Sequence, residues 1–535
     1  MKKTSCFILL ATALFALSAC GGGHGAEDSY VDGDKLAISL RNVYFESWAG
    51  GDVYTEEIEN RFKVKLIPSS YSYNDWNTQV VGAVNGNNLT DVFNYNVTQF
   101  NFADSYQFWA EGKVIKALPD DLSAWPNLKK LIEGLTNINS LKIDGHLYGI
   151  PIAKNIAKDK VDYSPFTYLY RRDWAKEWGV YKENDVYTYE EFTALIKEFN
   201  RRLNPDGNGD HFAMADVEWG FPSITNFYKD SPHCFSFDEA QNKYVGTFAT
   251  DSYLDGLDLA KTYQVAKIYG YDQYNASEGG ARKAYISSNC GVFYENLSYS
   301  NYQEIRDKME IANTGDPNFK LDDATAIMKV KGPDGKFALE GTDNWFSMTL
   351  FNADISDNKM NKVLDIIDFL LSEEGTRLAV YGLKDYDYKI DEDGNISLTS
   401  KGWKKEDPDD PNSKYVEKTN GAKYLRFMAT LGNDYLSVDP FTDKRTAAIL
   451  DAWDQEMDQA NKAHELRVFK EREEVMWLST PLKDFYEGQL LSKANEAVIQ
   501  YCYEKIDKSA FIGRVTSNDW VNVLDEINRT LGYTQ

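Results

Sequence analysis

The chain has 535 residues, of which 43% are hydrophobic and 26% are charged, so it is long enough for at least two lobes and its composition is not that of a disordered protein. Its formal net charge of −25 argues against nucleic acid as a partner, because that binding depends on cations that neutralise phosphates. The same charge repels an acidic polysaccharide overall, unless a local basic cleft overrides it. Aromatic residues reach 14%, enough for a core and for rings that stack on sugars.

The first residues have the pattern of a bacterial lipoprotein signal. Lys2 and Lys3 precede the apolar stretch 7–16, which is shorter than the roughly 20 apolar residues of a membrane-spanning helix. Residues 17–21, with the sequence LSACG, resemble a lipobox, in which Cys20 is lipidated and becomes the first mature residue. The alternative is an ordinary signal peptide followed by a chance cysteine.

This pattern predicts where the protein works. We expect a signal peptide over residues 1–19 and a flexible, glycine-rich tether over 20–34. The mature lipoprotein, carrying palmitate in its anchor, would then lie on the extracytoplasmic face of the cell membrane and touch the membrane through lipid alone. Three later cysteines, Cys234, Cys290 and Cys502, are odd in number and widely spaced, which favours free buried thiols over a disulfide framework or a zinc site.

From residue 35 the chain alternates between strand and helix patterns. Apolar alternation, helical spacing and turn residues predict strands over 35–45, 64–68 and 91–95 and helices over 54–62 and 76–84. In open α/β sheets ligands bind beyond the carboxyl ends of the strands. We therefore predict polar and aromatic ligand contacts at the strand ends.

Farther along the chain the sequence predicts helices interrupted by a polar insertion. Thr188 precedes an acidic first turn and begins a helix, and residues 361–371 form another. The stretch 385–418 is rich in turn residues and predicts an inserted hairpin and loop, with 391–395 as its turn. From residue 446 to the end the pattern is mostly helical.

Residues 204–210, with the sequence NPDGNGD, resemble the first half of an EF-hand loop. Oxygen ligands at positions 1, 3 and 5, a glycine at 6 and a carbonyl at 7 suit Ca²⁺. Position 12 is Ala215 instead of Glu, so a structural calcium would need a reshaped loop, and an Asn/Asp/Gly turn is the alternative. The predicted calcium ligands are Asn204, Asp206, Asn208, Asp210 and Asp216.

Six segments also occur in the order known from one protein family. They are residues 36–68, 89–93 (LTDVF), 112–118 (GKVIKAL), 145–151 (GHLYGIP), 168–174 (YLYRRDW) and 368–382. Together they resemble the family 1 extracellular solute-binding proteins of ABC importers, particularly the large oligosaccharide-binding lipoproteins. The chain departs from the family pattern after Gly382 and over 291–300, which puts the identity of the ligand in doubt.

The resemblance implies an α/β, two-lobed, periplasmic-binding-protein-like fold with a ligand cleft between the lobes and a helix-rich C-terminal part. We expect residues 35–152 plus about 325–400 in lobe 1 and residues 153–324 plus about 415–535 in lobe 2. Lobe closure on a ligand then presents the closed form to the permease subunits of the importer.

The expected ligand is a carbohydrate, most plausibly an oligosaccharide, held by aromatic rings under the sugar faces and by amides on the hydroxyls. Core packing is the competing explanation for each ring. The predicted ligand contacts are Trp48, Tyr54, Asn94, Tyr95, Trp219, Tyr294, Asn344 and Trp345.

The predicted activity is sugar transport by a monomeric binding protein, with no chemistry on the ligand. The sequence has five His, none at metal-ligand spacing, and it shows no nucleophile elbow and no phosphate-binding glycine loop. Two alternatives stay open: a lipid-anchored enzyme that degrades glycans, since paired carboxylates arise easily among 83 acidic residues, and a binding protein of the same fold for peptides or for a sensor.

Overall fold

The computed structural model describes residues 28–533, except 32, 74, 98–101, 155–162, 208–210, 218–219, 271, 273–278, 393, 400–418, 433–442 and the side chains of 102–104. The predicted signal peptide, Cys20 and most of the tether lie outside the described residues. Among the described residues, no helix is long and apolar enough to cross a membrane. The three cysteines Cys234, Cys290 and Cys502 are buried and free, as the spacing predicted.

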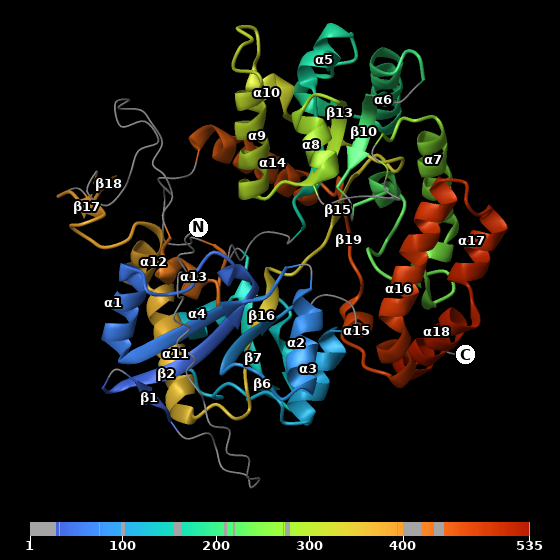
Figure 1. Cartoon of the computed structure of the whole chain (residues 1–535). Coiled ribbons are helices and arrows are strands. Elements are labelled where there is room, and N and C mark those ends of the chain that lie inside the picture. Colours follow the sequence, from blue (N-terminus) through green and yellow to red (C-terminus); the bar gives the residue numbers. More distant parts are fainter. Residues whose placement is uncertain are drawn as a thin grey trace, which may run out of the picture.

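The first lobe is built on a six-stranded sheet, which lies in the lower part of Figure 1. Its strand order is β1-β2-β4-β16-β7, with β3 paired to β2; β2, β3 and β4 run parallel, whereas β16 runs antiparallel to both β4 and β7. The strands are β1 (Tyr30–Val31), β2 (Lys35–Asn42), β3 (Val64–Ser70), β4 (Val92–Tyr95), β7 (Gly149–Ala153) and β16 (Trp345–Phe351).

Helices cover both faces of this sheet because its strands are apolar on both sides. They are α1 (Val53–Phe62), α2 (Trp76–Asn85), α3 (Phe102–Glu111), α4 (Pro126–Glu133), α11 (Asp357–Leu371), α12 (Glu373–Val380) and α13 (Gly421–Arg426). A single hydrophobic cluster joins the sheet to these helices. The short strands β5 (Lys142–Ile143) and β6 (His146–Leu147) form a hairpin before β7, and the hairpin β17 (Tyr388–Ile390) and β18 (Ile396–Leu398) projects from α12, as the turn at 391–395 predicted.

The second lobe contains a five-stranded sheet of order β10-β13-β8-β14-β9. Its strands are β8 (Phe166–Tyr170), β9 (Val186–Tyr187), β10 (Phe212–Asp216), β13 (Cys290–Asn296) and β14 (Ala326–Val330), and a separate hairpin joins β11 (Phe235–Asp238) to β12 (Lys243–Gly246). The helices around it are α5 (Arg172–Glu177), α6 (Tyr189–Leu203), α7 (Asp251–Val265), α8 (Gly280–Ile286), α9 (Tyr299–Ala312) and α10 (Leu321–Ala324). Thr188 caps α6 through a full capping box with Glu191, which explains why the helix begins where the sequence predicted.

The C-terminal part is helical, as predicted, and packs on the second lobe. It comprises α14 (Lys444–Lys462), α15 (Glu473–Met476), α16 (Pro481–Cys502), α17 (Lys508–Val515) and α18 (Asn518–Leu531). Residues of α16, α17 and α18 belong to the same hydrophobic cluster as α6 and α7, and α14 packs against α9 in a second cluster.

Several segments cross between the lobes. The strand β15 (Phe337–Glu340) pairs in parallel with β19 (Leu466–Phe469), and Ser164 N donates to Glu340 O at 2.7 Å. Figure 1 shows β15 and β19 lying between the two sheets.

The two lobes exchange more chain than the sequence predicted, and two boundaries need correction. Strand β14 belongs to the second sheet, although residues from about 325 were assigned to lobe 1. Residues 422–429 pack in the core of the first lobe, although residues from about 415 were assigned to lobe 2. Apolar strands and helices fit either core, so periodicity does not reveal which sheet an element joins.

Candidate ligand-binding site

Two buried asparagines shape the carboxyl edge of the first sheet. Asn42 ends β2, and its side chain accepts a hydrogen bond from Tyr44 N at 2.9 Å. Asn94, at the end of the adjacent strand β4, accepts one from Val43 N at 3.0 Å through Oδ1. Together they hold a 3₁₀ turn, η1 (Val43–Phe45), which ends the strand earlier than the sequence predicted.

Four rings surround this edge, and we call Tyr44, Trp76, Phe346 and Phe427 the aromatic rim. The Tyr44 ring centroid lies 6.5 Å from that of Trp76 and 5.6 Å from that of Phe427, while Trp76 and Phe346 are 6.2 Å apart. The Trp76 indole donates to Asn94 O at 2.9 Å, which fixes the rim to the end of β4. Tyr44, Phe346 and Phe427 are half-buried, whereas Trp76 is buried.

The row of rings continues on both sides of the rim. Tyr73 is 60% exposed and packs 6.3 Å from Trp76. On the other side Tyr424 lies 6.1 Å from Phe427 and stacks on Trp48 at 5.8 Å with nearly parallel planes. Such a row offers successive apolar faces to a chain of rings, as sugars are.

Beneath the rim lie three buried polar side chains, Asn94, Ser347 and Thr349, which we call the polar floor. Thr349 is the cross-strand partner of Asn94, and all three residues are at most 1% exposed. Asn94 Nδ2, Ser347 Oγ and Thr349 Oγ1 have no hydrogen-bond partner among the described residues. An unsatisfied buried polar group costs about 1–3 kcal/mol, so three together are not neutral for the fold.

The floor also holds an unusual backbone conformation. The register of β16 against β7 shifts between Trp345 and Met348, and Ser347 within this bulge has φ = 61°. A non-glycine residue in the left-handed region is strained, and such residues cluster at ligand sites.

The predicted contacts Trp48 and Tyr54 lie behind the rim. Both are 3% exposed. Trp48 donates through Nε1 to Asp52 Oδ2 at 3.0 Å, and the Tyr54 hydroxyl donates to Asp387 Oδ2 at 3.0 Å. Burial first, and then the Asp387 carboxylate, raises the pKa of the Tyr54 phenol. In this conformation these side chains support α1 and the rim; ligand contact by either one stays a prediction.

Tyr95, Asn344 and Trp345 are buried as well. Tyr95 packs 4.6 Å from the Trp109 ring of α3. Asn344 accepts through Oδ1 from Thr136 N at 2.9 Å, and Trp345 donates through Nε1 to Thr136 O at 3.0 Å. These bonds fix the loop after α4 to the start of β16.

Trp345 also marks a junction between the lobes. Its ring stacks 6.0 Å from that of Trp477, which follows α15 in the C-terminal part, and Lys470 Nζ bonds Asp343 Oδ1 nearby at 3.1 Å. Trp345 therefore lies where the C-terminal crossing segment meets the first lobe.

In the second lobe Tyr294 lines a small recess at the sheet edge from which the crossing segments leave. Tyr294 is 7% exposed, and its hydroxyl accepts from Asn226 Nδ2 at 2.8 Å. The recess is bordered by the aromatic residues Phe166, Tyr168, Phe227, Phe337 and Trp453 and by Lys329, which is ion-paired with Glu456. Trp219 lies outside the described residues.

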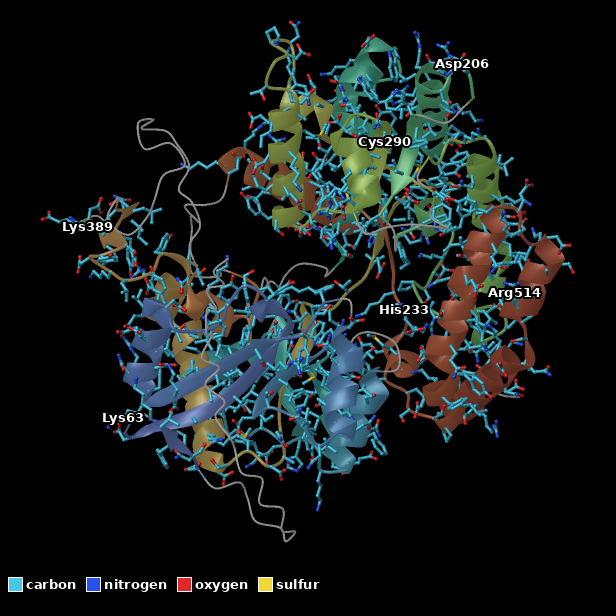
Figure 2. The ribbon with its side chains drawn as sticks, in the orientation of Figure 1. Lys63, Asp206, His233, Cys290, Lys389 and Arg514 are labelled. Atoms are coloured by element: carbon cyan, nitrogen blue, oxygen red, sulfur yellow. The ribbon has the colours of Figure 1, made fainter. Side chains whose placement is uncertain are left out.

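The predicted calcium loop is described in part. Asn204 is buried and ends α6, and Gly207 has φ = 68°. Asp206 lies at the end of the second lobe that faces away from the first lobe (Figure 2). Asn208 and Asp210 lie outside the described residues, and among the described ones no three His, Cys, Asp or Glu side chains come together as metal ligands.

The prediction of Asp216 as a fifth calcium ligand is wrong. Asp216 ends β10, about 13 Å along the strand from the loop at its start. Its carboxylate accepts from Ser223 N at 2.8 Å and Ser223 Oγ at 2.7 Å. Burial raises its pKa to about 7, although these hydrogen bonds act in the opposite direction. It faces the second core and not the loop.

None of the four rings of the rim was predicted as a ligand contact from the sequence. Tyr44 was taken as part of the first strand and Trp76 as a core position of its helix, whereas Phe346 was passed over for its neighbour Trp345. Each signal was present: Tyr44 follows a strand end, and Phe427 belongs to a Tyr-x-x-Phe spacing that puts two rings on one face of a helix.

Comparison with known proteins agrees with this architecture. No family model and no curated relative matches the chain. Among solved structures, an extracellular solute-binding protein from Bifidobacterium longum subsp. infantis covers 94% of this chain and 98% of its own, with a TM-score of 0.63 and 12% identity. FusA, an ABC-transporter substrate-binding protein of S. pneumoniae in complex with kestose, covers 92% and 96%, with a TM-score of 0.55 and 14% identity.

The alginate-binding protein AlgQ2, in a structure without calcium ion, is similar over 94% of this chain and 95% of its own, with a TM-score of 0.56 and 14% identity. These three neighbours are an extracellular solute-binding, an ABC-transporter substrate-binding and an alginate-binding protein. At such identities the likeness establishes the fold and does not carry over the ligand. The expectation of a two-lobed fold is confirmed: the chain has the fold of the substrate-binding proteins of ABC transporters.

Proposed function

We propose that this protein captures an oligosaccharide between its two lobes and delivers it to an ABC importer. The observation that carries the proposal is the aromatic rim above the polar floor, at the carboxyl edge of the first sheet. Rings remove the apolar faces of a sugar from water, and amide and hydroxyl groups take its hydroxyls. The proposal is supported by the sugar-binding neighbours of the same fold.

Binding would involve both lobes and no bond-making. The rim supplies stacking faces from the first lobe, and the recess at Tyr294 supplies further rings from the second lobe. A ligand that touches both stabilises the closed arrangement, because it binds that arrangement better than the open one. The permease subunits of an importer would then recognise the closed monomer.

The test is calorimetric titration of the folded chain with kestose, cycloalternan, Man1GlcNAc and alginate oligomers, which are ligands or named substrates of the neighbours. We expect at least one glycan to bind without being consumed. Phe427→Ala should weaken that binding at least tenfold, since it removes one of the four rings of the rim. Phe485→Ala removes an exposed ring of α16, 63% exposed, and should leave binding unchanged.

Three outcomes would overturn the proposal. If the protein binds peptides and no glycan, it is a binding protein of the same fold with a peptide ligand. Degradation of a glycan would indicate an enzyme. Equal effects of Phe427→Ala and Phe485→Ala would place the ligand away from the rim. Small-angle scattering gives an independent check, since a bound glycan should reduce the radius of gyration.

We also propose that the protein is a lipoprotein on the extracytoplasmic face of the cell membrane. The support is the lipobox-like sequence LSACG that ends at Cys20 and Gly21, followed by the glycine-rich tether. Metabolic labelling with a palmitate analogue should mark the wild-type chain and not Cys20→Ser. Labelling of both chains, or release of the wild-type chain into the medium, would contradict the anchor.

A structural calcium in the loop 204–210 is proposed as well. Its support is the alternation of Asn204, Asp206, Asn208 and Asp210, the turn at Gly207, and neighbours that include AlgQ2 without calcium ion and an EF-hand mutant of FusA. Added Ca²⁺ should raise the Tm of the EDTA-treated wild type by several degrees and leave Asp206→Ala unchanged. If Ca²⁺ does not change the Tm, the loop is a turn that binds no calcium.

A further inference from the structure

The polar floor has a feature that neither the fold nor the rim explains. Asn94 Nδ2, Ser347 Oγ and Thr349 Oγ1 are fully buried side-chain atoms without a hydrogen-bond partner among the described residues. Native proteins satisfy the large majority of such atoms. Three such atoms on the neighbouring strands β4 and β16 indicate a bonding partner that the protein itself does not supply.

The direction of the free amide is fixed. Asn94 Oδ1 accepts from Val43 N, so the other end of the amide, Nδ2, is the one left free; a flipped amide would set a donor against a donor. Thr349 is opposite Asn94 on β16, so their side chains lie on the same face of the sheet. The Trp76 indole, bonded to Asn94 O, places this group beside the rim.

The chemistry of the floor selects an uncharged partner. An amide N–H donates, and the hydroxyls of Ser347 and Thr349 each donate or accept, so a hydroxyl group is a suitable partner for each of the three. No lysine or arginine of the described chain bonds to these side chains. A carboxylate or ammonium group placed there would be buried without a counter-ion, which is strongly unfavourable.

The bulge in β16 lies beside the floor. Phe346, a ring of the rim, is joined directly to Ser347, whose φ of 61° is in the strained left-handed region. Ser347 therefore connects a ring of the rim to the polar floor along one strand.

We propose that the polar floor is a terminal subsite that takes one uncharged, hydroxyl-bearing group from the end of a glycan. The inference rests on the proposed function and specifies which part of the ligand this subsite recognises, namely its neutral end unit. A glycan whose end unit carries a carboxylate is then rejected at this subsite even where the rim accepts its rings.

The test compares Thr349→Val, which removes only the hydroxyl, with Thr376→Val. Thr376 is equally buried in the first lobe, and its hydroxyl donates to Leu370 O at 3.3 Å. With kestose, cycloalternan and Man1GlcNAc as probes, Thr349→Val should raise the Kd of whichever glycan the wild type binds about tenfold. Its ligand-free Tm should stay equal to or above that of the wild type, whereas Thr376→Val should lower the Tm and leave the Kd unchanged.

A second variant guards against a folding defect. Ser347→Gly removes a floor hydroxyl and relieves the left-handed φ, so it should raise the ligand-free Tm while weakening the same glycan. The inference is overturned if both floor variants bind like the wild type. It is also overturned if Thr349→Val loses as much Tm as Thr376→Val, which would indicate a structural internal water in the floor. If the wild type binds none of the probes, the proposed function fails first and the subsite fails with it.

Discussion

The Asp52 carboxylate joins the helix that opens the first lobe to the helix that carries part of the rim. Its Oδ1 accepts from the backbone N–H groups of Tyr54 and Thr55, which caps α1, and from Gly421 N at the start of α13. Its Oδ2 accepts from the Trp48 indole and from the Thr55 hydroxyl. Asp52→Ala removes all of these acceptors at once.

The expected cost follows from the groups left behind. Loss of the helix cap costs about 1 kcal/mol, and the Gly421 N–H, left without this acceptor, costs about 1–3 kcal/mol, whereas the Trp48 indole keeps Thr55 Oγ1 as an acceptor at 3.2 Å. The sum is about 2–4 kcal/mol. For a lobe of this size each kcal/mol lowers the Tm by about 2–4 °C, so the transition of the first lobe should fall by roughly 4–16 °C.

Differential scanning calorimetry measures this shift directly. Asp121→Ala is the matched control, because Asp121 also accepts from a backbone N–H and a hydroxyl, both of Ser123, but on the exposed surface. It should lower the Tm by no more than a few degrees. A first-lobe Tm that falls by less than about 3 °C in Asp52→Ala would refute the assignment of Asp52 as the link between α1 and α13.

Two further predictions concern the same lobe and the C-terminal helices. Gly421→Ala should lower the Tm and weaken glycan binding, because an added Cβ would lie 1.9 Å from Thr55 Oγ1 and push α13 away; unchanged binding by calorimetry would contradict this. Glu471 and Glu487 are buried around a single ammonium, Lys483, and burial followed by the Glu487 carboxylate raises the pKa of Glu471 well above its usual value. A carboxyl with a raised folded-state pKa contributes most below its unfolded pKa of about 4.3 and loses that contribution as pH rises through the folded value, so the urea midpoint should fall above about pH 5. Glu471→Gln should flatten this slope and stabilise the chain at pH 8; a less stable variant at pH 8 would disprove the prediction.

The sequence predicted those parts of the fold that depend on local pattern. The helix after Thr188, the strand that ends at Tyr95 and the hairpin around 391–395 were recognised because caps, apolar runs and turn residues act over a few positions. The assignment of β14 to the second sheet depends on pairing between strands that are distant in the sequence. The hydrophobic periodicity of one segment does not show which distant strand it pairs with.

The predicted contacts and the aromatic rim meet at one edge of the first sheet, but the four rings of the rim were not among the predicted contacts. Asn94 was selected as a residue at a strand end, and the structure does place it under the rim. Trp345 was selected as a ligand contact and Phe346 was not, yet Trp345 is 1% exposed and Phe346 is half-buried. Ser347, with its positive φ, follows these two rings in the bulge of β16, and the local sequence pattern does not predict this irregularity.

The most direct test of the account is glycan binding by the wild-type chain and by Phe427→Ala, measured side by side by calorimetric titration. The account predicts a glycan that binds the wild type, survives unchanged, and binds Phe427→Ala at least tenfold more weakly. At 100 times its Kd this glycan should add about 2.7 kcal/mol of stability to the wild type. A wild-type chain that binds no glycan, or a Phe427→Ala variant that binds one equally well, would contradict the claim that the aromatic rim is a carbohydrate site.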